Sequence, residues 1–137
     1  MSERPWAFAR AEHRGSSLAG FNIYCAGCRH PHFVTTLPRD GRMLKPPCPS
    51  SSITSVYGLN VCFVADVEDD AELQEYSTAA YLIFAGWRMS PDGSLFSHKT
   101  LGIATSLALA FHAQRGLDAM LLRALRRSRP PEERAAA

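Results

Sequence analysis

The segment NIYCAGCRHPH, residues 22–32, places two cysteines three residues apart and two histidines directly behind them. In this Cys-x-x-Cys pattern, one tight turn can present the thiolates of Cys25 and Cys28 to a single tetrahedral metal ion. Gly27 lies between them and suits such a turn. Because thiolates and imidazole nitrogens are common zinc ligands in proteins, the segment predicts half of a structural zinc site.

The other half of the site has to come from residues farther along the chain. Cys48 lies in a segment rich in proline and serine, and we take it as the third ligand. A zinc ribbon would carry its fourth ligand near Ser51, but serine is not a credible ligand for zinc. His32 is the preferred fourth ligand, because Pro31 can turn the chain back toward Cys28. The alternatives for the fourth ligand are His30 and Cys62.

The Cys-x-x-Cys pair has a second interpretation, as the reactive pair of a thiol oxidoreductase. In that class of protein, the motif opens a helix that lowers the pKa of the first thiol. Here Pro31 and a β-prone run follow the motif, so little room remains for a helix. A third interpretation is a buried thiol without chemistry, which Cys62 fits best because it lies in the apolar run LNVCFVADV. The zinc site is the main hypothesis, and the oxidoreductase remains an alternative.

No arrangement typical of an enzyme is present in the sequence. No histidine is followed two residues later by glutamate, as the zinc-deaminase pattern requires, and the metalloprotease pattern His-Glu-x-x-His is absent. Glycine-rich phosphate loops and nucleophile elbows are absent too. We therefore expect a structural metal ion in a non-catalytic protein.

Charge is unevenly distributed along the chain, although the net charge is only +2. Residues 66–75 are strongly acidic, whereas the C-terminal segment LLRALRRSR is basic. Either surface could bind a protein partner of complementary charge. The residues predicted to contact a partner are Asp66, Glu68, Asp69, Asp70, Glu72, Arg123, Arg126 and Arg127.

A zinc-containing nucleic-acid-binding module is the alternative to a protein-binding one. It would use basic residues around the metal together with the terminal arginines, and its affinity would fall steeply with salt. The small net charge and the lack of aromatic residues among the terminal arginines weaken this alternative. The basic residues around the metal are Arg29, Arg39, Arg42 and Lys45.

The scaffold that has to position these residues is expected to be a single α+β domain of 137 residues. Residues 1–52 are interrupted by proline and glycine, which predicts a loop-rich, zinc-ribbon-like subregion with little core of its own. Residues 53–129 predict an α+β core with a small antiparallel sheet and about three helices. Residues 130–137 predict a frayed tail.

The elements of that core follow from local patterns. Residues 55–67 are rich in valine, phenylalanine and tyrosine and predict one or two strands. A helix is expected from about 70 to 79, with an aspartate at its N-cap. Residues 80–102 predict a β-hairpin around the turn Ser-Pro-Asp-Gly-Ser. Two further helices should follow, one ending at Gly116 and the other capped by Asp118.

The sequence also indicates a cellular setting. Its longest apolar stretch, Leu101 to Ala113, is much shorter than the roughly 20 residues that a membrane span requires. The N-terminal residues lack the apolar core of a signal peptide. We therefore expect a cytoplasmic protein without membrane contact, in which reduced thiols can serve as metal ligands.

Overall fold

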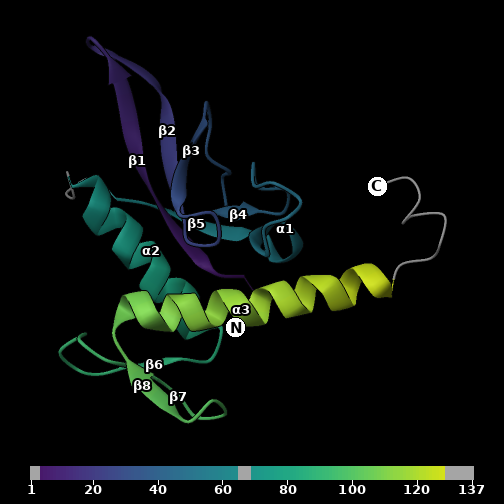
Figure 1. The fold of residues 1–137 in the computed structure, drawn as a ribbon. Helices are drawn as coiled ribbons and strands as arrows, with labels where there is room; N and C mark the ends of the chain where they lie inside the picture. Colours follow the sequence, from purple (N-terminus) through teal and green to yellow (C-terminus); the bar gives the residue numbers. More distant parts are fainter. Residues whose placement is uncertain (1–3, 65–68, 129–137) are drawn as a thin grey trace.

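The structure is a computed structural model that describes residues 4–64 and 69–128. The described residues form a five-stranded mixed sheet, a three-stranded antiparallel sheet and three helices, which confirms the α+β class (Figure 1). The elements are β1 (Trp6–Arg14), β2 (Ser17–Cys25), β3 (His30–Val34), β4 (Arg42–Met43), α1 (Thr54–Tyr57), β5 (Leu59–Phe63), α2 (Asp70–Phe84), β6 (Arg88–Met89), β7 (Phe96–His98), β8 (Ile103–Thr105) and α3 (Leu107–Arg127).

The large sheet has the strand order β3-β2-β1-β5-β4. β1 and β2 form an antiparallel hairpin in which Phe8 lies opposite Tyr24. β5 lies parallel to β1, with Ala7 opposite Val61. The large sheet is therefore mixed and was not predicted, whereas the small antiparallel sheet that the sequence predicted is formed by β6, β7 and β8. A parallel pair joins segments far apart in the sequence, and no local turn signal announces such a pairing.

The first part of the predicted loop-rich unit, residues 6–34, instead forms three strands, whereas residues 35–52 carry only the two-residue strand β4. β1 and β2 each have nine residues. Their alanines and charged residues have weak strand propensity, but Ala7 and Ala9 are fully buried and pack with Ile23 on one face of the sheet. Tertiary packing therefore overrides local propensity. Since Cys25 ends a long strand of a five-stranded sheet, a zinc-ribbon fold is not identified.

Two element boundaries in the middle of the chain also differ from those predicted. Residues 54–57 form the short helix α1, and strand β5 begins only after Gly58, whose positive φ of 76° ends the helix. α2 begins as expected, because the Asp69 side chain accepts a hydrogen bond from the Ala71 amide. It continues to Phe84, into the predicted hairpin, because its buried residues recur at helical spacing.

The hairpin itself is shorter than expected but has the expected turn. β6 and β7 pair antiparallel with Met89 opposite Phe96. The Ser90 amide donates to the Leu95 carbonyl oxygen at 2.9 Å, and Gly93 has a positive φ of 77°. β8 then pairs with β7 and completes the small sheet. The turn chemistry was therefore a reliable signal, whereas the length of the flanking strands was not.

The two helices predicted near the C-terminus are one continuous helix, α3. Ser106 caps its N-terminus by accepting a hydrogen bond from the Leu109 amide. Gly116 lies inside the helix and does not end it. Asp118, predicted as an N-cap, instead binds the side chains of Tyr81 and Gln114. Its tertiary contacts replace the capping contact that the sequence suggested.

Replacing Gly116 with alanine is expected to stabilise the protein by about 0.5–1 kcal/mol, because glycine inside a helix is less favourable than alanine by that amount. An added Cβ would meet no atom within 4 Å. Chemical denaturation of the two proteins measures the difference. Destabilisation would instead indicate that Gly116 ends a helix with a backbone conformation that alanine resists.

Three clusters of buried side chains hold the fold together. Segment 35–52 packs Leu37, Met43 and Cys48 onto the face of the large sheet that carries Ala9 and Ile23. The helix α2 covers the opposite face, where the Phe8 amide donates to the Ser77 hydroxyl at 3.0 Å. A second cluster joins Ala26, Ile53, Tyr81 and Phe111. A third packs Trp87 and Phe96 of the small sheet region on Leu82 and Ala110.

The second cluster is the one that positions the predicted metal site. Ala26 belongs to the Cys-x-x-Cys turn, and it packs against α2 and α3 through Tyr81 and Phe111. In Figure 1, α3 crosses between the large sheet above it and the small sheet below it. The cysteine turn is therefore anchored to the helices rather than exposed on a free loop. Within the described ranges, no helix combines the length and apolar character that a bilayer crossing requires.

Candidate metal centre

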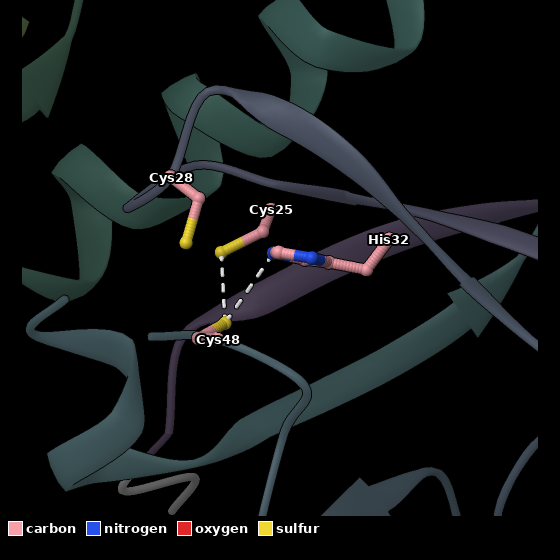
Figure 2. A group of neighbouring side chains, drawn as sticks. All are labelled: Cys25, Cys28, His32 and Cys48. Atoms are coloured by element: carbon pink, nitrogen blue, oxygen red, sulfur yellow. Dashed lines mark hydrogen bonds between the residues drawn. The ribbon is translucent and has the colours of Figure 1, made fainter. Parts of the chain in front are cut away.

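Four side chains from three segments converge beside the end of β2, as Figure 2 shows. They are Cys25, Cys28, His32 and Cys48, and their candidate ligand atoms all lie within 4.8 Å of one another. Cys48 Sγ is 3.6 Å from Cys25 Sγ and 3.6 Å from His32 Nε2. Sulfur and nitrogen ligands of a tetrahedral zinc ion lie about 3.6–3.8 Å apart, given the usual bond lengths. These two distances therefore match those expected around a tetrahedral metal ion.

Strand geometry brings two of these ligands to the same side of the sheet. His32 lies opposite Ile23 in the β2–β3 pair, and Ile23 and Cys25 lie two residues apart on one face of β2. Segment 35–52 covers that same face and carries Cys48. Cys28 reaches the group from the turn that joins β2 to β3. The alternation of side chains along β2 and β3 therefore builds the centre.

The turn between the two cysteines is held in place by both backbone and packing contacts. The Arg29 amide donates to the Cys25 carbonyl oxygen at 2.9 Å, and Arg29 adopts a positive φ of 57°. The Gln74 side chain of α2 donates to the same carbonyl oxygen at 3.1 Å. Gly27 is packed so closely on α1 that an added Cβ would lie 2.7 Å from Thr54 Cγ2. Glycine is therefore required here by space.

Replacing Gly27 with alanine is expected to destabilise the protein by about 1–3 kcal/mol and to weaken metal retention, because overpacking has costs of this size. Thr54 is fully buried and has little room to yield. Denaturation, together with a competition against a chelator, measures both effects. Gly116→Ala is the matched control, for which the opposite sign is expected. An unchanged stability of Gly27→Ala would contradict the packing of the turn on Thr54.

Of the three candidates for the fourth ligand, only His32 lies in the group of four. His30 is exposed, and its Nδ1 lies 3.0 Å from the Cys28 carbonyl oxygen. Cys62 lies on β5 and donates a hydrogen bond to the Phe63 carbonyl oxygen at 3.8 Å. Both residues are therefore placed outside the centre. Burial separates the two histidines, because His32 is only 9 % exposed.

Two hydroxyl groups beside the sulfurs were missed by sequence reasoning. Thr54 Oγ1 lies 3.4 Å from Cys25 Sγ, and Ser52 Oγ lies 3.4 Å from Cys28 Sγ. The two hydroxyl oxygens are 2.8 Å apart. Outer hydrogen bonds of this kind orient ligands and stabilise thiolate charge at metal centres. The signal that could have found them is the run of serine and threonine directly after Cys48.

The three thiols shift one another's protonation. A hydrogen bond from Cys48 is the largest influence on Cys25, and it lowers the pKa of Cys25 to about 5. The same hydrogen bond, together with burial, raises the pKa of Cys48. Burial also raises the pKa of Cys28. In the absence of a metal ion the cluster therefore favours a thiolate at Cys25, whereas a bound cation would favour thiolates at all three positions.

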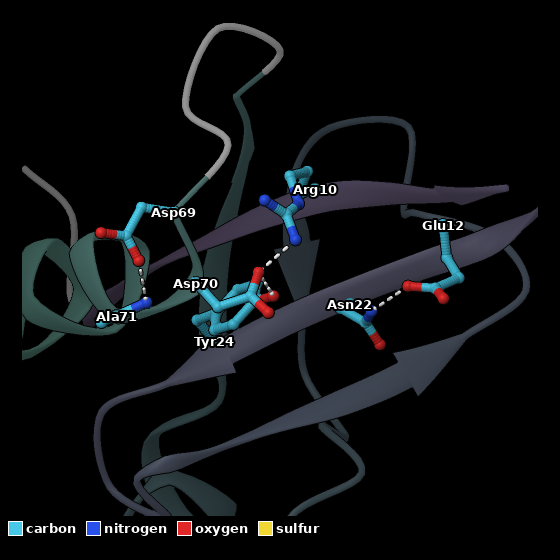
Figure 3. A network of polar contacts seen from close by, with 7 residues as sticks. All are labelled: Arg10, Glu12, Asn22, Tyr24, Asp69, Asp70 and Ala71. Atoms are coloured by element: carbon cyan, nitrogen blue, oxygen red, sulfur yellow. Dashed lines mark hydrogen bonds and ion pairs between the residues drawn. The ribbon is translucent and has the colours of Figure 1, made fainter.

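The described members of the acidic set predicted to bind a partner make contacts within the chain. Asp69 caps α2, and Asp70 forms an ion pair with Arg10 and accepts a hydrogen bond from the Tyr24 hydroxyl (Figure 3). Glu72 accepts a hydrogen bond from the Tyr76 hydroxyl. These carboxylates stabilise the start of α2 and its contact with the sheet. Two further members of the predicted set lie outside the described residues, namely Asp66 and Glu68.

The basic residues of the predicted partner surface lie on the C-terminal half of α3. Arg123, Arg126 and Arg127 are exposed there. Met120 is 59 % exposed and Leu121 is 37 % exposed, so apolar and basic side chains share this part of the helix. Figure 1 shows it projecting past α1 and the edge of the large sheet. This segment is therefore accessible to another molecule.

The basic residues of the nucleic-acid alternative are exposed as well. Arg39, Arg42 and Lys45 lie in or beside β4, in the segment that carries Cys48. The Arg29 guanidinium lies 5.0 Å above the centre of the Phe111 ring. A cation over an aromatic face is held by the charge distribution of the ring, so Arg29 has a contact within the protein. The other three side chains remain on the surface.

The donor set defines what the centre can do chemically. Three cysteine sulfurs and one imidazole can hold a metal ion such as zinc, and four protein ligands fill a tetrahedron. Such a centre cross-links the segments that supply its ligands. No protein-family model, curated protein or solved structure matches the chain, so its function is inferred from this centre and the surfaces around it.

Proposed function

We propose that Cys25, Cys28, His32 and Cys48 bind one structural zinc ion in a non-catalytic binding protein. The observation that carries this proposal is the approach of four ligand atoms from three segments to within 4.8 Å of one another. A catalytic zinc ion keeps one position open for water or substrate, whereas four protein ligands leave none. The polar side chains beside the sulfurs, Ser52 and Thr54, are hydroxyls, which stabilise thiolate ligands.

The ion would stabilise a part of the fold that has few other constraints. Segment 35–52 contains only the two-residue strand β4, yet it covers one face of the large sheet. Bound zinc would fasten Cys48 of this segment to the β2–β3 turn. It would also hold the start of α1, because Thr54 lies against Cys25 Sγ. The binding free energy of such a metal contributes directly to folding.

Replacement of zinc by cobalt tests the closed geometry directly. Tetrahedral Co²⁺ with thiolate ligands absorbs strongly in the visible range and shows sulfur-to-metal charge transfer, whereas water-rich octahedral sites absorb weakly. We expect a saturable tetrahedral spectrum at one equivalent of Co²⁺, which zinc then abolishes. A weak octahedral spectrum would contradict a centre filled by four protein ligands.

For the binding activity, we propose that an acidic protein partner docks on the C-terminal half of α3. Exposed Arg123 and Arg126 supply charge there, and exposed Met120 and Leu121 supply apolar area. Interfaces commonly combine such anchors with complementary charge. The acidic start of α2 is the weaker choice, because the described aspartates there already pair within the chain. The basic helix is therefore the surface to test.

Charge reversal distinguishes this surface from the nucleic-acid alternative. Arg123→Glu with Arg126→Glu should abolish capture of the acidic partner, while the matched pair Arg39→Glu with Lys45→Glu should leave capture unchanged. If the second pair instead abolishes a salt-sensitive binding of DNA or RNA, the nucleic-acid alternative is supported. Partner capture that survives reversal of both arginines on α3 would contradict the proposed surface.

The oxidoreductase alternative has one supporting observation, the lowered pKa of Cys25. A metal ligand requires the same thiolate, so the observation does not separate the two functions. Burial supports the metal site, because Cys25 has no exposed surface and a disulfide substrate has to reach the sulfur of a reactive thiol. A reactive Cys25 would be alkylated rapidly in the folded protein. We expect slow alkylation of Cys25. Fast alkylation would instead support the oxidoreductase alternative.

A further inference from the structure

A pocket of about 390 Å³ lies where α1, α2 and α3 meet. Its volume falls within the range of small-molecule sites, roughly 300–1,000 Å³. Its walls combine three aromatic rings, one carboxylate and several apolar side chains. None of the four candidate metal ligands lines it, so it is a separate site. The residues that carry the argument are Tyr57, Tyr81, Phe84, Gln114 and Asp118.

Three aromatic rings of the pocket lie beside one another at different angles. The Tyr57 and Phe84 ring centres are 5.3 Å apart with planes inclined by 74°. The Tyr81 and Phe84 ring centres are 6.3 Å apart with planes inclined by 38°. These inclined rings line the pocket together without stacking face to face. The faces of aromatic rings are electron-rich and attract organic cations.

The carboxylate of Asp118 is held in a fixed orientation on another wall. The Tyr81 hydroxyl donates to Oδ2, and the Gln114 amide donates to Oδ1 at 2.8 Å. The indole of Trp87 fixes Gln114 in turn, because it donates to Gln114 Oε1 at 2.9 Å. A carboxylate has about four acceptor positions, so these two hydrogen bonds leave it able to accept more.

No described residue that lines the pocket carries a positive charge to balance this carboxylate. Within residues 4–64 and 69–128, no lysine, arginine or histidine forms a salt bridge with Asp118. Burial raises the pKa of Asp118, which is the direction expected for a carboxylate withdrawn from water without a cationic partner. Burial and the charge of Asp118 together raise the pKa of Tyr57. A bound cation would satisfy the carboxylate and contact the ring faces at once.

We propose that this pocket binds an alkylated ammonium group, with Asp118 as counter-ion and the rings of Tyr57, Tyr81 and Phe84 as its walls. Besides these residues and Gln114, the lining side chains are Ala85, Leu117 and Leu121, so the methyl groups of such a ligand would meet apolar surface. Methylated ammonium groups need fewer hydrogen-bond acceptors than a primary ammonium and match aromatic walls. Free quaternary amines and methylated lysine side chains present the same chemistry. The inference goes beyond the proposed zinc centre and does not depend on it.

Titration of the full chain with choline, followed by calorimetry or by chemical-shift changes of the amides around the pocket, tests the proposal. The neutral control is 3,3-dimethylbutan-1-ol, in which a tert-butyl group replaces the trimethylammonium group. A parallel arm uses a short peptide that contains trimethyllysine. We expect saturable binding in at least one cationic arm and affinity for the neutral control weaker by about tenfold or more. Binding of choline alone assigns a free amine as the ligand, and binding of the peptide alone assigns a protein side chain.

Two variants connect that binding to the pocket. Asp118→Asn removes the charge with little change in shape and should weaken binding by about tenfold or more, while exposed Glu75→Gln, which removes one charge elsewhere, should not. If Asp118→Asn fails to fold, Tyr57→Leu tests the half-buried aromatic wall and should give a similar loss. The proposal is overturned if neither cation binds, if the neutral control binds equally well, or if the folded pocket variants bind as the wild type does.

Discussion

Cys25→Ser is expected to lose the bound zinc and most of the cooperative thermal unfolding transition. Cys25 is fully buried and lies 3.6 Å from Cys48 Sγ, so its loss removes a central ligand. Structural zinc contributes about 10–16 kcal/mol of binding free energy in zinc-finger peptides, so we expect a loss of stability on the order of 5 kcal/mol or more. Elemental analysis and circular dichroism during heating measure the two effects.

Cys62→Ser is the matched control for that experiment. Cys62 is a half-buried cysteine of β5 outside the group of four, and its sulfur contacts only the Phe63 carbonyl oxygen among the hydrogen bonds described. We expect it to retain zinc and to unfold near the wild-type temperature. If Cys25→Ser kept its metal and stability, or if Cys62→Ser lost them, the assignment of ligands would be wrong.

Trp87→Ala is expected to destabilise the protein by about 3–5 kcal/mol, which is typical of truncating a buried aromatic residue. Trp87 is 2 % exposed, packs with Leu82 and Phe96, and donates its indole hydrogen bond to buried Gln114. The substitution removes this packing and leaves an acceptor of Gln114 without its donor. Denaturant unfolding measures the loss.

Trp6→Ala provides the comparison, since it removes the same side chain from a different environment. Trp6 is 45 % exposed on β1, so less apolar area returns to water when it is truncated. We expect a smaller loss than for Trp87→Ala. Equal losses for both tryptophans would contradict the packing of the small sheet on α3.

The residues of the candidate centre could be predicted because their chemistry is local. The spacing of Cys25 and Cys28 indicates a shared turn. Pro31 was expected to turn the chain back, but it is a strand residue opposite Tyr24, and His32 instead reaches the group through the pairing of β2 with β3. The structure brings the two cysteines and His32 together with Cys48. Burial distinguishes His32 from His30, and burial depends on segment 35–52, which the sequence could not place.

The parts of the fold that the sequence did not predict depend on contacts between distant segments. β1 is a strand because Ala7 and Ala9 pack on β5 and β2, although alanine has weak strand propensity. Gly116 fails to end a helix because Asp118 is bound to Tyr81 and Gln114 rather than to a helix terminus. In both cases a tertiary contact outweighs a local preference.

The pocket between α1, α2 and α3 could not be predicted from the sequence for the same reason. Tyr57, Tyr81 and Asp118 come from α1, α2 and α3, and nothing in their sequence spacing brings them together. Sequence reasoning assigned Asp118 to a helix cap, which is a local and common use of aspartate. Likewise, the serine and threonine run after Cys48 suggests hydroxyl groups near the sulfurs, but which of them contact Cys25 and Cys28 depends on how the chain around α1 packs on the Cys-x-x-Cys turn.

The most direct test of the central claim is the metal content of the wild-type protein, purified without added metal and measured by elemental analysis beside its folded fraction. We predict one zinc ion per folded chain, with its removal by a strong chelator accompanied by loss of stability. A folded, stable protein that contains no metal, and that gains no stability when zinc is added, would contradict the account.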